Sequence, residues 1–189
     1  MLNPFLKSLY QILKQNVNRI YLSYSELIIE IDHRKLNEIL LFFKNHENCL
    51  YKLLVDIVII DLPQNKKRFS IVYNLCSLKY KSRLKIIVKL DEITPICSIT
   101  NLYKNANWME REAWDMYGIY FEQHPDLRRI LTDYGFEGFP LRKDFPLSGF
   151  KEVRYDDSQK RVVFEPVEMT QEFRIFNFNN PWNKQNLIK

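Results

Sequence analysis

The chain has 189 residues and a mass of 23.0 kDa, a length that suits one domain of about 150 residues with a remainder for a tail or arm. Hydrophobic residues make up 46% and charged residues 27%, so the chain can bury a core, and global disorder is excluded. The net charge of +5 is one-sided, because the first ninety residues carry 15 basic and 7 acidic groups whereas the rest carry 13 and 16.

Three patterns exclude further classes of protein. The longest apolar stretch, at 53–62, is interrupted by Asp56 and Asp61 and is shorter than the roughly 18 apolar residues of a membrane helix. Four glycines are too few and too scattered for a G-x-G-x-x-G turn or a P-loop. The three cysteines and three histidines form no C-x-x-C or H-x-x-x-H pattern, so we expect no zinc finger, iron–sulfur cluster or disulfide framework. The absence of a signal-peptide pattern indicates a reducing compartment.

The N-terminal segment predicts an amphipathic helix that begins at Asn3 or Pro4, because apolar residues recur at helical spacing up to Leu13. A transit peptide is the alternative for this basic, acid-free segment, but its few serines and its excess of lysine over arginine favour a helix of the mature fold. Residues 26–31 then predict a strand that pairs with a short strand near 20–22.

A second helix and three strands follow. Asp32 is expected to cap the helix, since apolar residues then recur at helical spacing. Apolar runs predict strands at Tyr51–Asp61, Arg68–Cys76 and Ser82–Leu90, and the polar turns between them favour an antiparallel meander. The order helix, strands, helix and three-strand meander predicts an α+β fold, a two-layer sandwich with a mixed sheet.

A third helix is predicted near residue 107. Asn107 can cap it, with Glu110 at the third helical position in a capping-box pattern, and Gly118 is placed to close it. Beyond the helix every glycine and five of the eight prolines fall within 118–181, so irregular turns replace regular elements.

The C-terminal part predicts a small hairpin, from Val153–Tyr155 and Arg161–Phe164, followed by an extended arm. The chain is therefore expected to divide into an α+β domain at 1–118, a Pro/Gly-rich loop region at 119–149, and the hairpin with its arm at 150–189.

The arm contains four aromatic residues: Phe173, Phe176, Phe178 and Trp182. Their burial contributes at most roughly 15 to 25 kcal/mol. Ordering about twenty backbone residues costs on the order of 20 to 40 kcal/mol. The arm therefore needs further hydrogen bonds and burial, which a partner protein offers more readily than a small domain. An arm folded back on its own domain remains the alternative.

Two clusters could carry chemistry. Glu112 and Asp115 lie three apart on the predicted helix and share a face, as paired carboxylates or metal ligands would. The simpler interpretation is an ion pair between Arg111 and Asp115, with Glu110 favoured by the helix dipole. His124 could act as a base or metal ligand beside Asp126. A hydrolase or metalloenzyme would then use His124 together with Glu112 and Asp115.

The alternative for His124 is structural. Pro125 suits a first helical position, which would place His124 at a cap and Asp126 in the first turn. Basic pairs at 66–68, 128–129 and 142–143, together with eleven tyrosines and thirteen phenylalanines, raise an RNA-binding organellar protein as an alternative function. Interleaved aspartates and the absence of an aromatic RNP strand weigh against it.

Several sequence runs form a distinctive set: WMERE and WDMYG at 108–118, HPDLRRILTDYGF at 124–136, PLRKDFPL at 140–147, and EVRY with EP at 152–155 and 165–166. Through these runs the sequence closely resembles the NADH dehydrogenase subunit 9 family, the mitochondrially encoded form of the 30-kilodalton (bacterial C-type) component of respiratory complex I. The earlier half matches more loosely. Residues carried over as family signature and expected partner interface are Trp108, Glu110, Arg111, Glu112, Asp115, His124, Pro125, Asp126, Arg128, Arg129, Arg142, Lys143, Asp144, Phe173, Phe176, Phe178 and Trp182.

The resemblance implies a structural subunit without cofactors or catalytic residues of its own. It places the chain in the peripheral, matrix-facing arm at the mitochondrial inner membrane, packed on the 49-kilodalton subunit near the quinone-binding region. The C-terminal extension is expected to lie over that neighbour, with membrane association only through the complex and no nucleic-acid partner. A short N-terminus, with little room for a targeting sequence, suits a gene read inside the mitochondrion.

Overall fold

A computed structural model describes residues 4–14, 16–24, 26–178, 180 and 182 of the chain. The chain groups into two compact units, Met1–Leu147 and Ser148–Lys189, and each is described by itself. Within the described residues no helix combines the length and the apolar character that a membrane crossing requires.

The first unit is built on a five-stranded mixed sheet, as predicted. Its strand order is β1-β2-β5-β4-β3, and only β2 and β5 run parallel among the neighbouring pairs of this sheet. The strands are β1 (Val17–Ser23), β2 (Glu26–Ile31), β3 (Leu53–Asp61), β4 (Phe69–Ser77) and β5 (Ser82–Leu90). The predicted antiparallel meander of β3, β4 and β5 is therefore confirmed.

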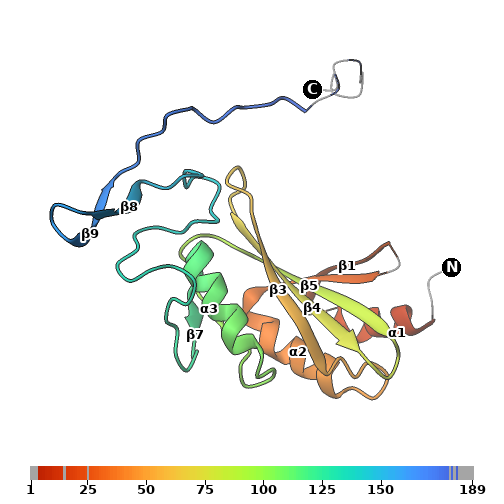
Figure 1. Cartoon of the computed structure of the whole chain (residues 1–189). Coiled ribbons are helices and arrows are strands. Elements are labelled where there is room, and N and C mark those ends of the chain that lie inside the picture. The colour runs from red at the N-terminus through yellow and green to blue at the C-terminus, as the bar shows by residue number, and fades with distance from the viewer. Residues whose placement is uncertain (1–3, 15, 25, 179, 181, 183–189) are drawn as a thin grey trace. The chain divides into compact units, whose positions relative to one another are not determined.

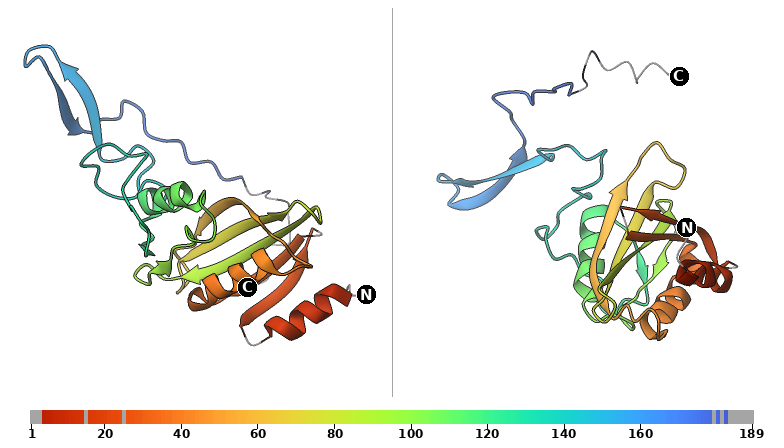
Figure 2. Two further views of the ribbon diagram at one scale, coloured as in Figure 1. Left: turned by 90° about the horizontal axis from the view of Figure 1, so that it is seen from below. Right: turned by 90° about the vertical axis from the view of Figure 1, so that its right-hand side faces the viewer.

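The hydrophobic core lies on one face of this sheet. A single row of paired residues crosses four strands from Ile29 through Ile86 and Tyr73 to Ile57, and all four side chains are buried. Helices α1 (Pro4–Leu13) and α2 (Leu36–Asn45) lie on the same side of the sheet (Figures 1 and 2). The arrangement is the two-layer α+β sandwich that the element order predicts.

Both N-terminal helices bury the residues that their spacing indicates. Leu9 and Leu13 of α1 are buried, which confirms that this segment is a helix of the folded unit. The apolar positions of α2 are buried too: Leu36, Ile39, Leu40 and Phe43. The carboxylate of Asp32 accepts a hydrogen bond from the backbone N–H of Arg34 at 3.0 Å, but it caps a short 3₁₀ turn, His33–Lys35, that leads into α2.

Helix α3 (Ala106–Tyr117) differs from its prediction at its start. The cap residue is Asn105, and no side chain caps this end, so the capping box of Asn107 and Glu110 is wrong. The Glu110 carboxylate is buried and used elsewhere, as described below. At the other end Gly118 adopts φ 74°, and its N–H bonds to the Trp114 carbonyl at 2.9 Å, which confirms it as the helix stop.

Irregular structure follows α3, as expected. We call residues 119–147 the clamped loop, because polar contacts fix it to the rest of the first unit. Its regular part is strand β7 (Phe121–Glu122), which pairs in parallel with β6 (Ile96–Cys97); two-residue strands of this kind carry no periodic signal and are not predicted. The expected helix at Pro125 is wrong, since 124–130 is irregular.

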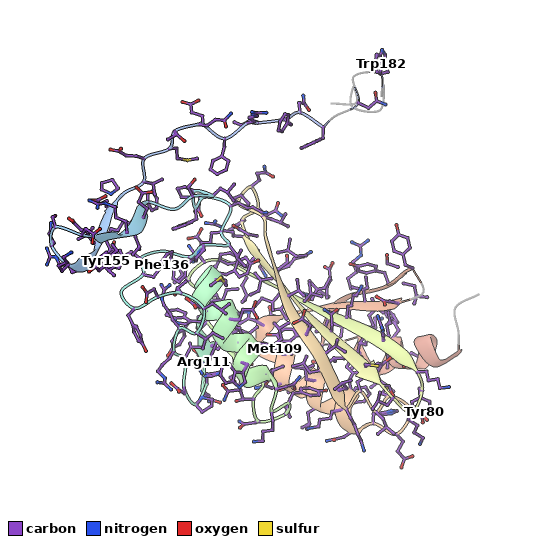
Figure 3. The ribbon with its side chains drawn as sticks, in the orientation of Figure 1. Tyr80, Met109, Arg111, Phe136, Tyr155 and Trp182 are labelled. Atoms are coloured by element: carbon purple, nitrogen blue, oxygen red, sulfur yellow. The ribbon has the colours of Figure 1, made fainter. Side chains whose placement is uncertain are left out.

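The second unit contains the predicted hairpin, formed by β8 (Lys151–Asp156) and β9 (Arg161–Pro166). The described arm residues beyond it form no helix or strand. All four arm aromatics are exposed, from 54% at Phe173 to 92% at Phe178. Figure 3 shows Tyr155 on the hairpin and Trp182 on the arm.

Gly118→Ala is expected to destabilise the first unit by about 2 to 4 kcal/mol, because φ +74° strains a residue with a Cβ and that Cβ would lie 2.6 Å from the Phe139 ring. The matched control is Gly135→Ala, where φ is +71° but no atom lies within 4 Å, so only the backbone strain of about 1 kcal/mol applies. Urea unfolding of both variants measures the difference, and equal losses would contradict the close approach at Gly118.

Candidate functional site

Helix α3 carries two fully buried carboxylates, Glu110 and Asp115, whereas Glu112 on the same helix is exposed. The predicted pairing of Glu112 with Asp115 as catalytic or metal-binding carboxylates is therefore wrong, because the two side chains lie in different environments. Among the described residues no group of three or more His, Cys, Asp or Glu side chains could hold a metal ion.

Asp115 holds the clamped loop by gathering several donors on one carboxylate. Its Oδ2 accepts hydrogen bonds from three consecutive backbone N–H groups, of Ile130 at 3.1 Å, Leu131 at 2.7 Å and Thr132 at 2.9 Å. Its Oδ1 accepts one from the Thr132 hydroxyl at 2.6 Å. Burial alone would raise the pKa of this carboxyl, but the Thr132 hydroxyl and the backbone donors outweigh it and keep the pKa below its usual value.

Arg129 is the cation that pairs with Asp115, so the predicted Arg111–Asp115 ion pair is wrong. Its Nη1 lies 3.2 Å from the Asp115 carboxylate and also donates to the Gly138 carbonyl at 3.0 Å. The guanidinium lies over the Phe139 ring, 5.2 Å from its centroid. Asp115 pairs with Arg129 of the loop and not with Arg111 at i, i+4 because its side chain faces the loop.

Arg111 instead joins the outer side of α3 to the loop. Its Nε donates to the Arg128 carbonyl at 3.0 Å, and its guanidinium lies 5.1 Å from the Trp108 ring centroid. Arg111 on α3 and Phe136 in the clamped loop are labelled in Figure 3. Trp108 is 64% exposed, so this arginine–tryptophan pair lies at the surface.

Glu110 ties α3 to the segment after β6. It accepts hydrogen bonds from the Ser98 hydroxyl at 2.6 Å and from the Ile99 backbone N–H at 2.8 Å. Burial raises the pKa of Glu110 to about 7, although these two hydrogen bonds oppose the rise. Ser98 also shares a hydrogen bond with the Thr100 hydroxyl at 2.9 Å, in which either oxygen can donate. The hydroxyl pair can therefore turn to serve either protonation state of Glu110.

His124 completes this buried group. Its Nδ1 accepts a hydrogen bond from the Asp126 backbone N–H at 3.1 Å, which assigns the proton to Nε2. That Nε2 lies 3.2 Å from the Asn107 carbonyl and 3.8 Å from the Glu110 carboxylate, and the side chain is 0% exposed. A histidine with both nitrogens occupied and no access to solvent acts as a structural support and not as a base.

A second buried ion pair fixes the far end of the clamped loop. The Arg68 guanidinium donates to both Asp61 oxygens, at 2.7 and 2.9 Å, in a bidentate contact across the β3–β4 turn. The same guanidinium donates to Asp144 at 3.0 Å, and the Lys143 backbone N–H donates to Asp61 at 2.7 Å. The Arg68 hydrogen bond holds the pKa of Asp61 below its usual value, although burial opposes it.

Arg142 adds a third attachment at the end of α3. Its Nε donates to the Tyr117 carbonyl at 2.6 Å, and its guanidinium lies over Phe139, 4.6 Å from the ring centroid. It also approaches the Glu92 carboxylate at 3.6 Å. One arginine of each basic group that raises an RNA-binding function, namely Arg68, Arg129 and Arg142, contacts the protein's own carboxylates.

The clamped loop presents apolar side chains outward although its polar contacts point inward. Tyr134 is 100% exposed, Leu147 is 85% exposed and Leu131 is 61% exposed. Pro125 is exposed as well. The site is therefore a fixed, partly apolar surface built on α3. The predicted arm residues Phe173, Phe176, Phe178 and Trp182 belong to the second unit and are described only within it.

The cysteines do not suit an iron–sulfur cluster. Cys49 precedes β3, Cys76 lies in β4 and Cys97 in β6, and all three are free thiols. A cluster requires several thiolates that converge on it. Burial raises the pKa of the Cys49 thiol to about 11, and burial followed by the Glu122 charge raises that of Cys97, so both thiols are held in the protonated form.

Fold and site together describe an α+β protein in which buried ion pairs fix an irregular loop to a helix. Residues 29–151 match the family model described as respiratory-chain NADH dehydrogenase, 30 Kd subunit. The chain is 51% identical to NADH-ubiquinone oxidoreductase subunit 9 of Reclinomonas americana, over 99% of this chain and 94% of the relative. It is 54% identical to NADH dehydrogenase [ubiquinone] iron-sulfur protein 3 of Marchantia polymorpha, over 95% of this chain and 92% of the relative.

A solved structure shares the fold. A chain of the membrane-bound sulfane sulfur reductase, an archaeal respiratory membrane complex, superposes with a TM-score of 0.64 at 21% identity, covering 77% of this chain and 87% of that one. The present chain belongs to the 30-kilodalton subunit family of respiratory-chain NADH dehydrogenase. It is a component of NADH:ubiquinone oxidoreductase, complex I, and its partners are other subunits of that complex.

Asp115→Asn is expected to destabilise the first unit by about 3 kcal/mol, because the amide cannot accept hydrogen bonds on both sides and Arg129 loses its counter-charge. Urea unfolding and limited proteolysis should report this loss, with new cleavage between 128 and 138. The control is Glu112→Gln, an exposed change on the same helix that should stay within about 0.5 kcal/mol of the natural chain. Equal stability of both variants would contradict the role of Asp115.

Glu110→Gln should remove a pH dependence of stability. The pKa of Glu110 is about 7 in the fold against an ordinary 4.5, so the folded state keeps a proton that the unfolded chain releases. Stability from this group is full below about pH 4.5 and falls as the pH rises to about 7, by up to about 1.4 kcal/mol per pH unit. Glutamine resembles the protonated form, and the hydroxyls of Ser98 and Thr100 can turn to accept its N–H.

The measurement is the free energy of unfolding from pH 4.5 to 8, by urea, for the natural chain and the variant. The variant should gain on the natural chain up to about pH 7, with a constant advantage above it. A constant difference at every pH would show that Glu110 keeps its ordinary pKa.

Proposed function

We propose that the chain is a non-catalytic structural and assembly subunit, without a cofactor, in the peripheral arm of complex I. It docks on a neighbouring subunit, the 49-kilodalton one, near the quinone-binding region, and supports electron transfer from NADH to ubiquinone without carrying electrons. The relatives support a mitochondrial location. The matrix side of the inner membrane and an organellar gene are part of this proposal.

The observation that carries the proposal is the clamped loop. A free irregular loop would lose conformational entropy on binding a partner, whereas a loop already fixed by Asp115 and by the Asp61–Arg68 pair loses little. Its outward apolar residues, among them Tyr134 and Leu147, then supply the contact area. Such a preorganised surface is what a permanent subunit interface uses.

The second unit supports the same function. The hairpin exposes one apolar face, with Val153, Tyr155, Val162 and Phe164 each between 56% and 59% exposed. On the other face Arg154 forms a bidentate ion pair with Glu165, at 2.7 Å for both contacts. A two-stranded hairpin with an unburied apolar face is marginal in water, so a partner surface is expected to complete it.

Removal of the arm tests this function. A chain that ends after Glu168 keeps β9 and the Val167–Phe150 backbone hydrogen bond of 3.2 Å, and should therefore keep the hairpin. We expect its incorporation into complex I, measured on native gels of mitochondria, to fall at least tenfold. Alanine at Phe173, Phe176 and Phe178 in the full chain should have a similar effect, because each ring is exposed and available to a partner.

The control is Gln171→Ala in the full chain, a polar and exposed position of the same arm, which should assemble normally. Normal assembly of both the truncated and the triple-alanine chain would show that the arm is dispensable. If complex I containing the truncated or the triple-alanine chain assembled normally but its iron–sulfur clusters had altered reduction potentials, a purely structural role would be contradicted.

A further inference from the structure

Glu110 is a buried carboxyl group with no lysine or arginine beside it. Its side chain is 0% exposed, and among the described residues His124 is the one basic side chain within 4 Å, with Nε2 at 3.8 Å from the carboxylate. A charge buried without a partner is costly, so such a group either keeps its proton or pairs with a charged imidazole. The contacts of His124 distinguish these two states.

The hydrogen bonds of His124 favour the neutral imidazole. In a charged imidazole both ring nitrogens carry a proton and act as donors. Nδ1 of His124 cannot donate, because it faces another donor, the Asp126 backbone N–H, at 3.1 Å. Nε2 donates to the Asn107 carbonyl at 3.2 Å. The fold therefore keeps the imidazole neutral and the proton on Glu110, and the pKa of about 7 that burial gives Glu110 agrees with this geometry.

Tyr73 of β4 and Cys97 of β6 lie near this pair and stay uncharged at neutral pH. Burial first, and then the Glu110 charge, raise the pKa of the Tyr73 hydroxyl well above its usual value. Burial first, and then the charge of Glu122 on β7, raise the pKa of the Cys97 thiol. With the imidazole neutral as well, Glu110 is the group of this cluster that changes its charge near pH 7.

An ionised Glu110 can accept more hydrogen bonds than it receives. The Ser98 hydroxyl at 2.6 Å and the Ile99 N–H at 2.8 Å already bind it. The Nε2–H of His124, at 3.8 Å, lies just beyond hydrogen-bond distance and is the next donor within reach. A small turn of the ring brings this donor to the carboxylate. Because the ring is rigid, the same turn moves Nδ1 away from the Asp126 N–H.

We propose that Glu110 and His124 form a pH-sensitive switch near the start of the clamped loop. While Glu110 keeps its proton, the neutral imidazole holds the turn at 124–126 through its Nδ1. When Glu110 ionises, the imidazole turns toward the carboxylate and releases the Asp126 N–H. These contacts lie within the first unit, so the switch does not depend on the proposed function.

The switch extends to the outer side of α3 but not to the middle of the clamped loop. The Asp126 carboxylate accepts a hydrogen bond from Arg128 at 2.8 Å, which holds the pKa of Asp126 below its usual value. The Arg128 carbonyl in turn accepts one from Arg111 at 3.0 Å. The turn at 130–132 is held by Asp115, which stays ionised near neutral pH because its hydrogen bonds lower its pKa. Ionisation of Glu110 should therefore loosen 124–128 and leave 130–132 fixed.

Hydrogen exchange of single amides in the full chain tests the switch. The protection of the Asp126 amide is divided by that of the Leu131 amide, which binds Asp115 at 2.7 Å, so that a general loss of stability cancels. This ratio should fall about threefold or more from pH 6 to pH 8, with a midpoint near pH 7. In Glu110→Gln, which has no proton to lose, the ratio should be constant. A constant ratio in the natural chain, or an equal fall in Glu110→Gln, would overturn the proposal.

The ring nitrogens of His124 provide a second measurement that does not need this variant. In ¹⁵N NMR spectra of the natural chain we expect Nε2 protonated and Nδ1 unprotonated from pH 6 to pH 8. The Nε2 signal should shift with the same midpoint as the exchange ratio. A charged imidazole near pH 7, or an Nε2 signal that does not move, would overturn the proposal. The control is Glu112→Gln, an exposed change on the same helix, and loss of the shift in this variant would assign the effect to the wrong acid.

Discussion

The clamped loop depends on one buried carboxylate. Asp115 accepts hydrogen bonds from three successive backbone N–H groups and a hydroxyl at part-buried positions, and a typical hydrogen bond contributes about 0.5 to 1.5 kcal/mol, or more when it is made to a charged group. Its charge also retains Arg129, which reaches on to the Gly138 carbonyl. Helix α3, the turn at 130–132 and the segment up to 138 are therefore connected by these contacts, and this part of the loop is a fixed extension of α3.

The regular elements could be predicted because their causes are local. The spacing of Leu36, Ile39, Leu40 and Phe43 indicates a helix whatever packs on it, and Gly118 closes α3 through its own backbone conformation. The polar contacts could not be predicted in the same way. For Asp115 the local rule favours Arg111, four residues away, but the actual partner, Arg129, comes from a loop whose path the sequence does not reveal. The partner of Asp115 is therefore determined by its burial against the loop and not by the i, i+4 spacing of charges on the helix surface.

The other polar contacts, at Asp61 and at Glu110, differ in how far they could be predicted from the sequence. Asp61 and Arg68 flank one turn of the meander, so their pairing follows once β3 and β4 are predicted. The addition of Lys143 and Asp144 to that pair joins residues far apart in the chain and carries no local signal. Glu110 shows the same limit, because the capping-box pattern suits it equally well and only the fold directs it to Ser98.

One feature of the sheet constrains how the chain is made. The hairpin of β1 and β2 joins the sheet through β5 alone, and this parallel pairing of 27–31 with 84–88 closes a long loop. During synthesis β2 therefore cannot pair with β5 until the whole meander has left the ribosome. Until then the apolar faces of the first helix and of the β1–β2 hairpin are not covered by the sheet. The N-terminal segment is made first but is incorporated late, so chaperones have most to protect at the start of this chain.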